Sequence, residues 1–165
     1  FYDDAGVVSK PWHGGTMNIF TKIKRDHDEA RDMMNTILET PDADARLELY
    51  EELKIAILSH AKSEEKTFYQ ALKQNKEWAE EVPHMKKEHK EVEDLFKEID
   101  GLDAESAMWW EKFGEVRQAL LHHMDEEEKE VFKEVKPEMP AMESEELGQL
   151  MDELEERVKV TLEAA

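Results

Sequence analysis

Hydrophobic residues recur along this chain every three to four positions, a spacing typical of amphipathic α-helices. The pattern begins at Met17 and predicts five helices, over residues 17–40, 43–76, 83–101, 106–136 and 144–162. Asp42 and Asp44 are both suitable N-cap residues for the second helix. Because the breaks are short, consecutive helices should run antiparallel. We therefore expect an all-α fold, an antiparallel up-down four-helix bundle with an additional C-terminal helix.

Residues 1–16 lack this periodicity and contain three of the six glycines. We interpret them as an N-terminal extension, either native or added to the protein, and assign no function to Trp12 or His13. The chain then divides into this extension, a bundle over residues 17–136 and a C-terminal helix within residues 137–165.

Each of the first four helices has an inward-facing apolar stripe that is interrupted by one histidine. In the second and fourth helices a glutamate follows one turn after the histidine. These six polar positions are His27, His60, Glu64, His89, His123 and Glu127. They interrupt faces that are otherwise suited to a hydrophobic core, so they require an explanation.

The polar positions also belong to an internal repeat. The segment HAKSEEKTFY at His60 resembles HMDEEEKEVF at His123, and RDHDEARDMM around His27 resembles KEHKEVEDLF around His89. The offsets between the paired histidines are 63 and 62 residues. Nearly equal offsets predict two similar helical hairpins about a pseudo-twofold axis, with their polar residues at one depth.

Composition excludes several classes of function. The chain has 42 Asp and Glu against 22 Lys and Arg, a net charge of −20, which disfavours binding to nucleic acid or to an anionic membrane. It contains no cysteine, so disulfides, thiolate metal sites and iron–sulfur clusters are excluded. No apolar stretch approaches the ~20 residues of a membrane-spanning helix, and no signal peptide is apparent. We expect a cytoplasmic protein, and the sequence identifies no protein partner.

The six polar positions are well suited to binding metal. A buried carboxylate costs several kcal/mol unless a cation accompanies it, and the inward stripes carry no Lys or Arg at this depth. Four imidazoles and two carboxylates form a nitrogen and oxygen donor set that suits first-row metals such as iron. A single inward histidine is more often structural, but four in register with two glutamates favour a metal site. The adjacent Glu65 and Glu128 point away from the stripes and are predicted to face solvent.

Four other polar residues leave alternatives open. His84 and His122 lie beside the stripes, which favours surface positions, although a shift of helix register would make either one a ligand. Asp26 and Glu88 each precede a stripe histidine. Either carboxylate would accept a hydrogen bond from an imidazole or would face solvent.

The motifs resemble those of the hemerythrin-like (HHE cation-binding) domain over about residues 17–136. The matching positions are Asp26-His27, His60 to Glu64, Glu88-His89 and His123 to Glu127. The resemblance implies two non-haem iron ions in an antiparallel four-helix bundle. It further implies that His27 and His60 bind one iron and that His89 and His123 bind the other. Glu64 and Glu127 would then bridge the ions beside an oxo or hydroxo group.

One position departs from the oxygen-carrying hemerythrins, because Met85 lies one turn before His89 where those proteins have a second histidine. The set of four His and two Glu is similar to that of bacterial iron-centre repair proteins. The resemblance implies a protein that binds or reacts with oxygen, nitric oxide or peroxide at the iron pair. The alternatives are an enzyme that detoxifies peroxide or nitric oxide, and a protein that stores iron or donates it to damaged centres. The sequence does not choose among them.

Overall fold

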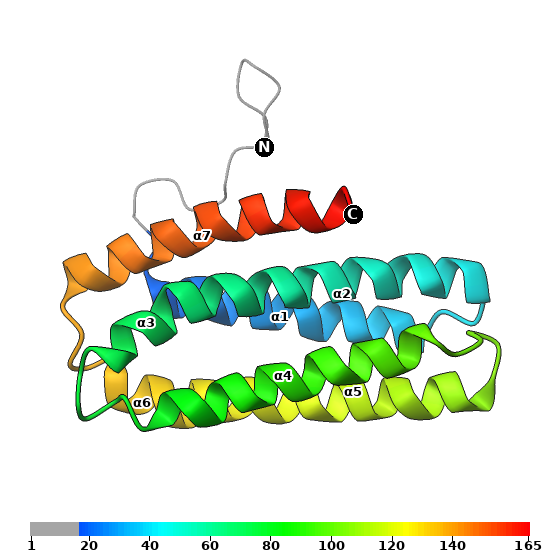
Figure 1. The fold of residues 1–165 in the computed structure, drawn as a ribbon, viewed down its shortest axis with the longest axis horizontal. Coiled ribbons are helices and arrows are strands. Elements are labelled where there is room, and N and C mark those ends of the chain that lie inside the picture. The colour runs from blue at the N-terminus through cyan, green and yellow to red at the C-terminus, as the bar shows by residue number, and fades with distance from the viewer. Residues whose placement is uncertain (1–16) are drawn as a thin grey trace, which may run out of the picture.

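The structure is a computed structural model that describes residues 17–165, so the predicted extension, with Trp12 and His13, lies outside the described residues. The elements are α1 (Ile19–Leu38), α2 (Ala43–Lys66), α3 (Phe68–Lys73), α4 (Glu81–Asp100), α5 (Ala107–Glu126), the π-helical segment η1 (Glu127–Val131), α6 (Phe132–Val135) and α7 (Ala141–Glu163). Figure 1 shows four antiparallel rods, formed by α1, by α2 with α3, by α4, and by α5 with η1 and α6. The predicted all-α four-helix bundle with a C-terminal helix is confirmed.

Local capping determines where the helices begin. The Asp42 side chain accepts a hydrogen bond from the Ala45 amide at 2.9 Å, which selects Asp42 as the N-cap of α2. Ser106 caps α5 in the same way, through the Trp109 amide at 3.2 Å. The other three starts differ slightly from the prediction: α1 begins at residue 19, α4 at residue 81 and α7 at residue 141.

The predicted second helix is interrupted at Thr67, where φ and ψ are −115° and −78°. The hydroxyl groups of Ser59, Ser63 and Thr67 each donate a hydrogen bond to the carbonyl oxygen four residues earlier, an interaction that bends helices. The chain resumes as α3. The apolar spacing of the predicted second helix places Ala71 in the core, but in α3 Leu72 is fully buried and Ala71 is only half-buried. The prediction missed this shift because periodicity assumes an unbroken helix.

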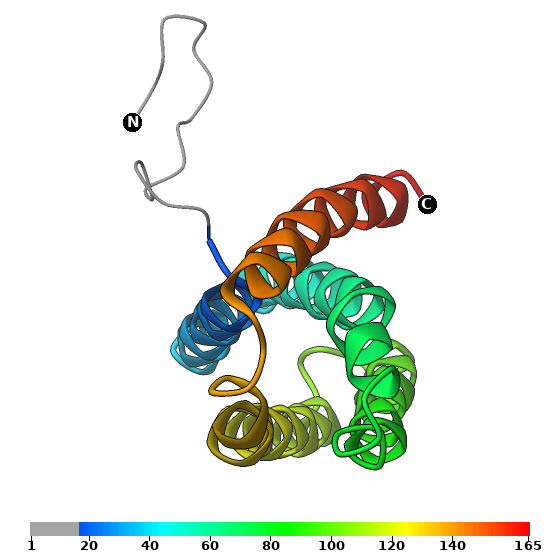
Figure 2. The same cartoon turned by 90° about the vertical axis from the view of Figure 1, so that its left-hand side faces the viewer.

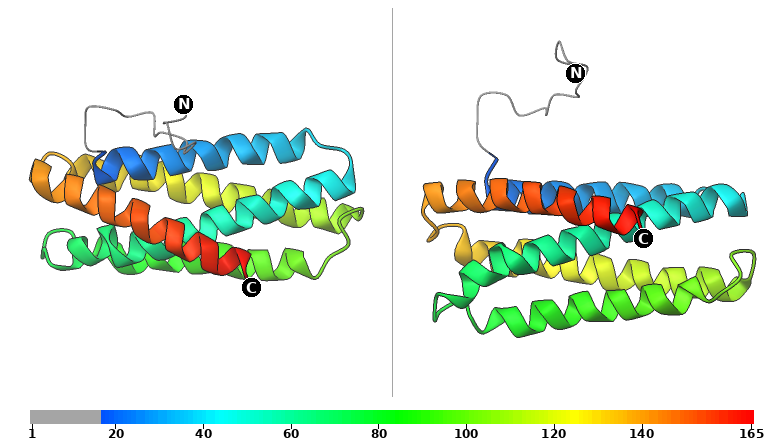
Figure 3. Two further views of the ribbon diagram at one scale, coloured as in Figure 1. Left: turned by 90° about the horizontal axis from the view of Figure 1, so that it is seen from above. Right: turned by 45° about the horizontal axis from the view of Figure 1, so that its top comes forward.

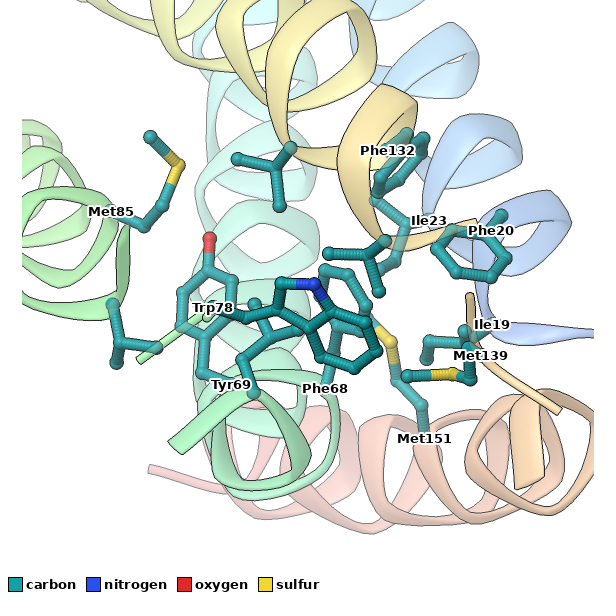
Figure 4. Packing of buried hydrophobic residues seen from close by; sticks show 14 residues of the cluster. Ile19, Phe20, Ile23, Phe68, Tyr69, Trp78, Met85, Phe132, Met139 and Met151 are labelled. Atoms are coloured by element: carbon teal, nitrogen blue, oxygen red, sulfur yellow. The ribbon is translucent and has the colours of Figure 1, made fainter. Parts of the chain in front are cut away.

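The apolar side chains form two clusters, one at each end of the bundle. At one end Phe20, Phe68 and Phe132 pack edge to face with ring centroids 5.2–5.9 Å apart (Figure 4). At the other end the cluster includes Tyr50 and Trp109. In each rod the predicted polar positions lie between residues of the two clusters. None of the described helices combines the length and the apolar character needed to cross a membrane.

The additional helix α7 lies against α1 and α2 (Figures 2 and 3). A buried lysine joins it to α1, because Lys22 Nζ lies 2.8 Å from Asp26 and 2.9 Å from Glu155 of α7. Burial is the largest influence on the pKa of Lys22 and lowers it, but the two carboxylates outweigh burial and raise the pKa overall. The two ion pairs thus stabilise the positive charge of Lys22, which α7 helps to bury.

A glycine permits a close approach of α7 to the backbone at the start of α1. A Cβ atom at Gly148 would lie 2.7 Å from the carbonyl carbon of Asn18, which is backbone and cannot rotate away. We expect Gly148→Ala to destabilise the fold by about 1–3 kcal/mol. Gly114, on the exposed side of α5, has no such neighbour, so Gly114→Ala should stabilise the fold by up to about 1 kcal/mol. Urea unfolding of both variants tests this, and a stabilising Gly148→Ala would contradict the packing.

Candidate metal centre

The six predicted polar side chains meet in one layer between the two apolar clusters, and we call them the inner cluster. Its members are His27 from α1, His60 and Glu64 from α2, His89 from α4, His123 from α5 and Glu127 from η1. The side chains of Glu64 and Glu127 are completely buried. No histidine side chain of the cluster is more than 8% exposed. All four rods of the bundle therefore contribute to this layer.

The inner cluster contains two overlapping groups of potential ligand atoms, each with all atoms within 4.8 Å of one another. One group consists of His27, His60, Glu64 and Glu127, and the other of Glu64, His89 and His123. Glu64 Oε1 lies 3.5 Å from His60 Nε2 and 3.1 Å from His89 Nε2. Since Glu64 belongs to both groups, its carboxylate is placed to serve two neighbouring cations at once.

Several of these atoms are buried without any hydrogen-bond partner. They are Nε2 of His27, Nε2 of His60, both carboxylate oxygens of Glu64 and Oε1 of Glu127. An unsatisfied buried polar atom is costly, and an unpaired buried carboxylate is more so. Cations between these atoms would satisfy all of them together. The residues present therefore fit a metal centre.

The electrostatics of the layer also favour cations. Burial is the largest influence on Glu64 and raises its pKa, but interactions with His60 and His89 outweigh it and hold the pKa well below the ordinary value. Burial likewise lowers the pKa of His89, but the nearby carboxylates of Glu64 and Glu65 outweigh this and raise it to about 9. The carboxylates thus stabilise positive charge in this layer.

A second set of carboxylates orients the imidazoles. Each histidine places Nδ1 2.7–2.9 Å from a carboxylate oxygen of a neighbouring rod. The pairs are Asp26 with His60, Glu65 with His89, Glu88 with His123 and Glu128 with His27. An N–H donated from Nδ1 leaves Nε2 as the atom that faces the layer, which is the arrangement of a metal-binding histidine. Each rod gives one carboxylate to the next, so the pairs close a ring around the bundle.

These carboxylate–histidine contacts correct one prediction and resolve one alternative that the sequence left open. Glu65 and Glu128 do not simply face solvent, because their side chains are only 30% and 15% exposed and each contacts a histidine. The helical-wheel angle gives the direction of Cα–Cβ, whereas a long Glu side chain reaches across to the adjacent rod. Asp26 and Glu88, for which two roles were open, are hydrogen-bond partners of imidazoles.

Tyr69 is a member of the site that the sequence analysis missed. Its hydroxyl donates a short hydrogen bond to Glu127 Oε2 and lies 3.4 Å from His89 Nε2. Burial is the largest of the effects that raise its pKa well above 10, so it remains a proton donor. The repeat contained a clue, since Tyr69 stands nine residues after His60 and Phe132 occupies the same place after His123. The two hairpins differ at this position by one hydroxyl group.

Both glutamates of the inner cluster precede irregular helix. The break at Thr67 follows Glu64 by three residues, and the π-helical segment begins at Glu127 itself. Such departures from α-helical geometry are frequent at functional sites. They let the two glutamates keep their inward direction while the remainder of each rod continues into the apolar cluster.

His84 and His122 do not belong to the inner cluster. Their side chains are 51% and 68% exposed and lie near Glu126 on the outside of α4 and α5. The structure thus agrees with the surface positions that the stripes favoured.

An apolar cavity of about 270 Å³ lies between α2 and α4 and reaches the inner cluster. His27, His60 and His89 form part of its lining. Its apolar lining residues are Ile57, Leu58, Ala61, Val92, Leu120 and Met124. Five charged residues also line the cavity, namely Lys62, Glu65, Lys86, Lys90 and Glu93. Most of its wall is nevertheless apolar, which suits a small, uncharged molecule.

Comparison with known proteins places this arrangement in a family. Residues 18–135 match the model of the hemerythrin HHE cation-binding domain. The fold is similar to the crystal structure of a hemerythrin HHE cation-binding domain-containing protein from Mycobacterium kansasii, a homologue of Rv2633c, with a TM-score of 0.79 and 22% identity over 88% of this chain and 89% of that one. A search of curated proteins gives no match. The domain match covers most of the chain, which therefore belongs to the hemerythrin HHE cation-binding family.

Proposed function

We propose that this chain holds a pair of iron ions in the inner cluster and binds a small diatomic molecule, oxygen or nitric oxide, beside them. His27, His60 and Glu127 would hold one ion and His89 and His123 the other, with Glu64 between the two ions. The observation that carries the proposal is the pair of overlapping donor groups that share Glu64 and whose innermost atoms have no other partner.

The donor set supports iron as the metal. Imidazole nitrogens and carboxylate oxygens suit iron, and the chain has no cysteine to provide a softer site. One donor group has four residues and the other has three. Each ion would therefore keep coordination positions for an external ligand. When bound, the iron pair supplies those positions and the electrons for ligand binding.

The protein's own contribution is orientation and access. The carboxylate ring holds each imidazole in one tautomer, so that Nε2 faces the layer. The cavity between α2 and α4 provides a route whose apolar side chains favour oxygen or nitric oxide over charged molecules. A ligand that enters there meets His27, His60 and His89.

Metal analysis and ligand titration test this function. Protein from iron-replete cells should contain two iron ions per chain, and its optical spectrum should change reversibly with oxygen or nitric oxide. Ala61→Phe, which introduces a large side chain into the cavity, should slow ligand binding without changing the iron content. An iron-free protein, or a spectrum indifferent to both gases, would contradict the proposal.

A second candidate, decomposition of peroxide, is favoured by Tyr69. Its buried hydroxyl group lies against Glu127 and His89, where it can donate a proton to an oxygen atom of a small ligand.

If peroxide is turned over, we expect Tyr69→Phe to lower the rate by about 100-fold, the usual scale of general acid catalysis, and to preserve the iron content. Tyr50→Phe is the matched control, because Tyr50 is also buried but belongs to the apolar cluster at the other end of the bundle from Tyr69, where its hydroxyl donates a hydrogen bond to Asp100. Stopped-flow measurement of peroxide consumption distinguishes the variants. Equal rates in the Tyr69→Phe and Tyr50→Phe variants would show that Tyr69 takes no part in the reaction.

A further inference from the structure

A second group of metal-binding residues lies on the outside of α4 and α5. It comprises His84 and Glu88 from α4 and His122 and Glu126 from α5, and we call it the outer cluster. None of these four residues belongs to the inner cluster. The two histidine side chains are more than half exposed, whereas the two glutamate side chains are only 9% and 17% exposed. The cluster therefore opens to solvent above two nearly buried carboxylates.

The four side chains alternate around a closed circuit. His84 Nε2 lies 2.8 Å from Glu126 Oε1 and 3.6 Å from Glu88 Oε2. His122 Nε2 lies 3.2 Å from Glu88 Oε2 and 3.0 Å from Glu126 Oε2. A tetrahedral zinc ion with bonds of 2.0–2.1 Å separates its ligands by roughly 3.3 Å. The nitrogen-to-oxygen distances of the outer cluster are close to this value.

Direct contacts between the histidines and the glutamates explain the outer cluster less well than a bound cation does. Glu126 Oε2 is buried and accepts no hydrogen bond, although His122 Nε2 lies 3.0 Å away. One divalent cation would neutralise both carboxylates and would use the imidazoles in their neutral form. The ligand atoms of His84, Glu88 and Glu126 lie within 4.8 Å of one another, close enough to share an ion.

We propose that the outer cluster is a separate, solvent-facing site for a divalent cation, with zinc as the best-matched ion. Imidazole nitrogens and carboxylate oxygens are donors that zinc binds. His84, Glu88 and Glu126 offer three of them within 4.8 Å of one another, and His122 Nε2 lies beside the two carboxylates. The site is distinct from the inner cluster in its ligands, its exposure and its access, since it opens into a hollow that Asp125, Lys129 and Glu130 also line.

Glu88 connects the two clusters. Its Oε1 accepts the hydrogen bond from His123 Nδ1 at 2.9 Å, while its Oε2 faces His84 and His122. A cation in the outer cluster would bind the same carboxylate that orients His123 of the inner cluster. Occupation of the outer site should therefore alter the electronic environment of His123.

Counting bound zinc ions tests the proposal whatever metal the inner cluster holds. We expect the wild-type protein to bind one more zinc ion than the double variant His84→Ala/His122→Ala, measured by isothermal titration and by competition with a chromophoric chelator. The variant should lose affinity at this site by about 100-fold or more, at least the loss seen when a ligand's hydrogen-bond partner is removed. Both replaced side chains are exposed, so the fold should persist, which circular dichroism checks.

Asp125→Asn is the matched control, because Asp125 lines the same hollow but lies outside the circuit of four donors. It should bind the same number of zinc ions as the wild type. Equal zinc counts in the wild type and the double variant would overturn the proposal. Loss of the inner ions together with the outer one would overturn the claim that the sites are separate. Neither result bears on whether the inner cluster holds iron.

Discussion

Glu64→Ala is expected to abolish binding of both metal ions, whereas Glu127→Ala should weaken chiefly the ion held by His27 and His60. The difference follows from geometry, because Glu64 belongs to both donor groups and Glu127 to only one. Removing Glu64 leaves His89 and His123 with no carboxylate from the inner cluster in their group. Iron content per chain, measured after growth in iron-replete medium, gives the result directly.

A glutamine at the same position provides a second readout. Glu64 is a fully buried carboxylate whose charge, when no cation is bound, is balanced by the imidazoles of His60 and His89, which hold its pKa well below the ordinary value. Glu64→Gln removes that charge and should therefore lower both the iron content and the thermal stability of chelator-treated protein at neutral pH. Glu52→Gln, an exposed carboxylate of the same helix, serves as the control and should change neither quantity. Full iron retention in Glu64→Ala would refute the proposed centre.

Glu65→Gln and Glu128→Gln are expected to lower metal affinity by about 10–100-fold each, the usual effect of removing the partner of a metal-binding histidine. Glu65 accepts the Nδ1 hydrogen bond of His89 at 2.9 Å, and Glu128 accepts that of His27 at 2.7 Å. An amide side chain of the same size keeps the shape but removes the charge. Competition with a chelator of known affinity measures the change.

Glu128 needs an additional control because it also forms an ion pair with Arg31 at 2.7 Å. Arg31→Gln removes that ion pair but leaves the hydrogen bond to His27 intact. If the orientation of the imidazole is what matters, Arg31→Gln should retain most of the affinity that Glu128→Gln loses. Similar losses in both variants would instead assign the effect to surface charge.

The duplicated hairpin explains why the carboxylate ring is regular. Asp26 and Glu88 occupy equivalent places in the two hairpins, as do Glu65 and Glu128, with the same offsets of 62 and 63 residues as the histidines. The pseudo-twofold arrangement therefore extends beyond the inner cluster. It ends at Tyr69, whose counterpart is a phenylalanine, so a proton donor is present on one side of the layer only.

The sequence by itself determined the bundle and the six positions that face one another. Apolar periodicity is a local property, and it orients each helix whatever its neighbours are. One histidine interrupts each stripe between the residues of the two apolar clusters, so antiparallel packing alone brings the four imidazoles to the same depth. Glu64 and Glu127 follow their histidines by one turn and therefore share their direction.

Only the tertiary structure decided which side chains from different rods meet. The partners of Glu65 and Glu128 depend on which rods are adjacent and on how far a flexible side chain reaches, and neither is encoded in the period of one helix. Tyr69 enters the site because the helix breaks at Thr67, where hydroxyl groups compete for backbone carbonyls. The contact at Gly148 likewise depends on two segments far apart in the chain. Local patterns specify directions, whereas contacts between rods depend on distances that arise only after packing.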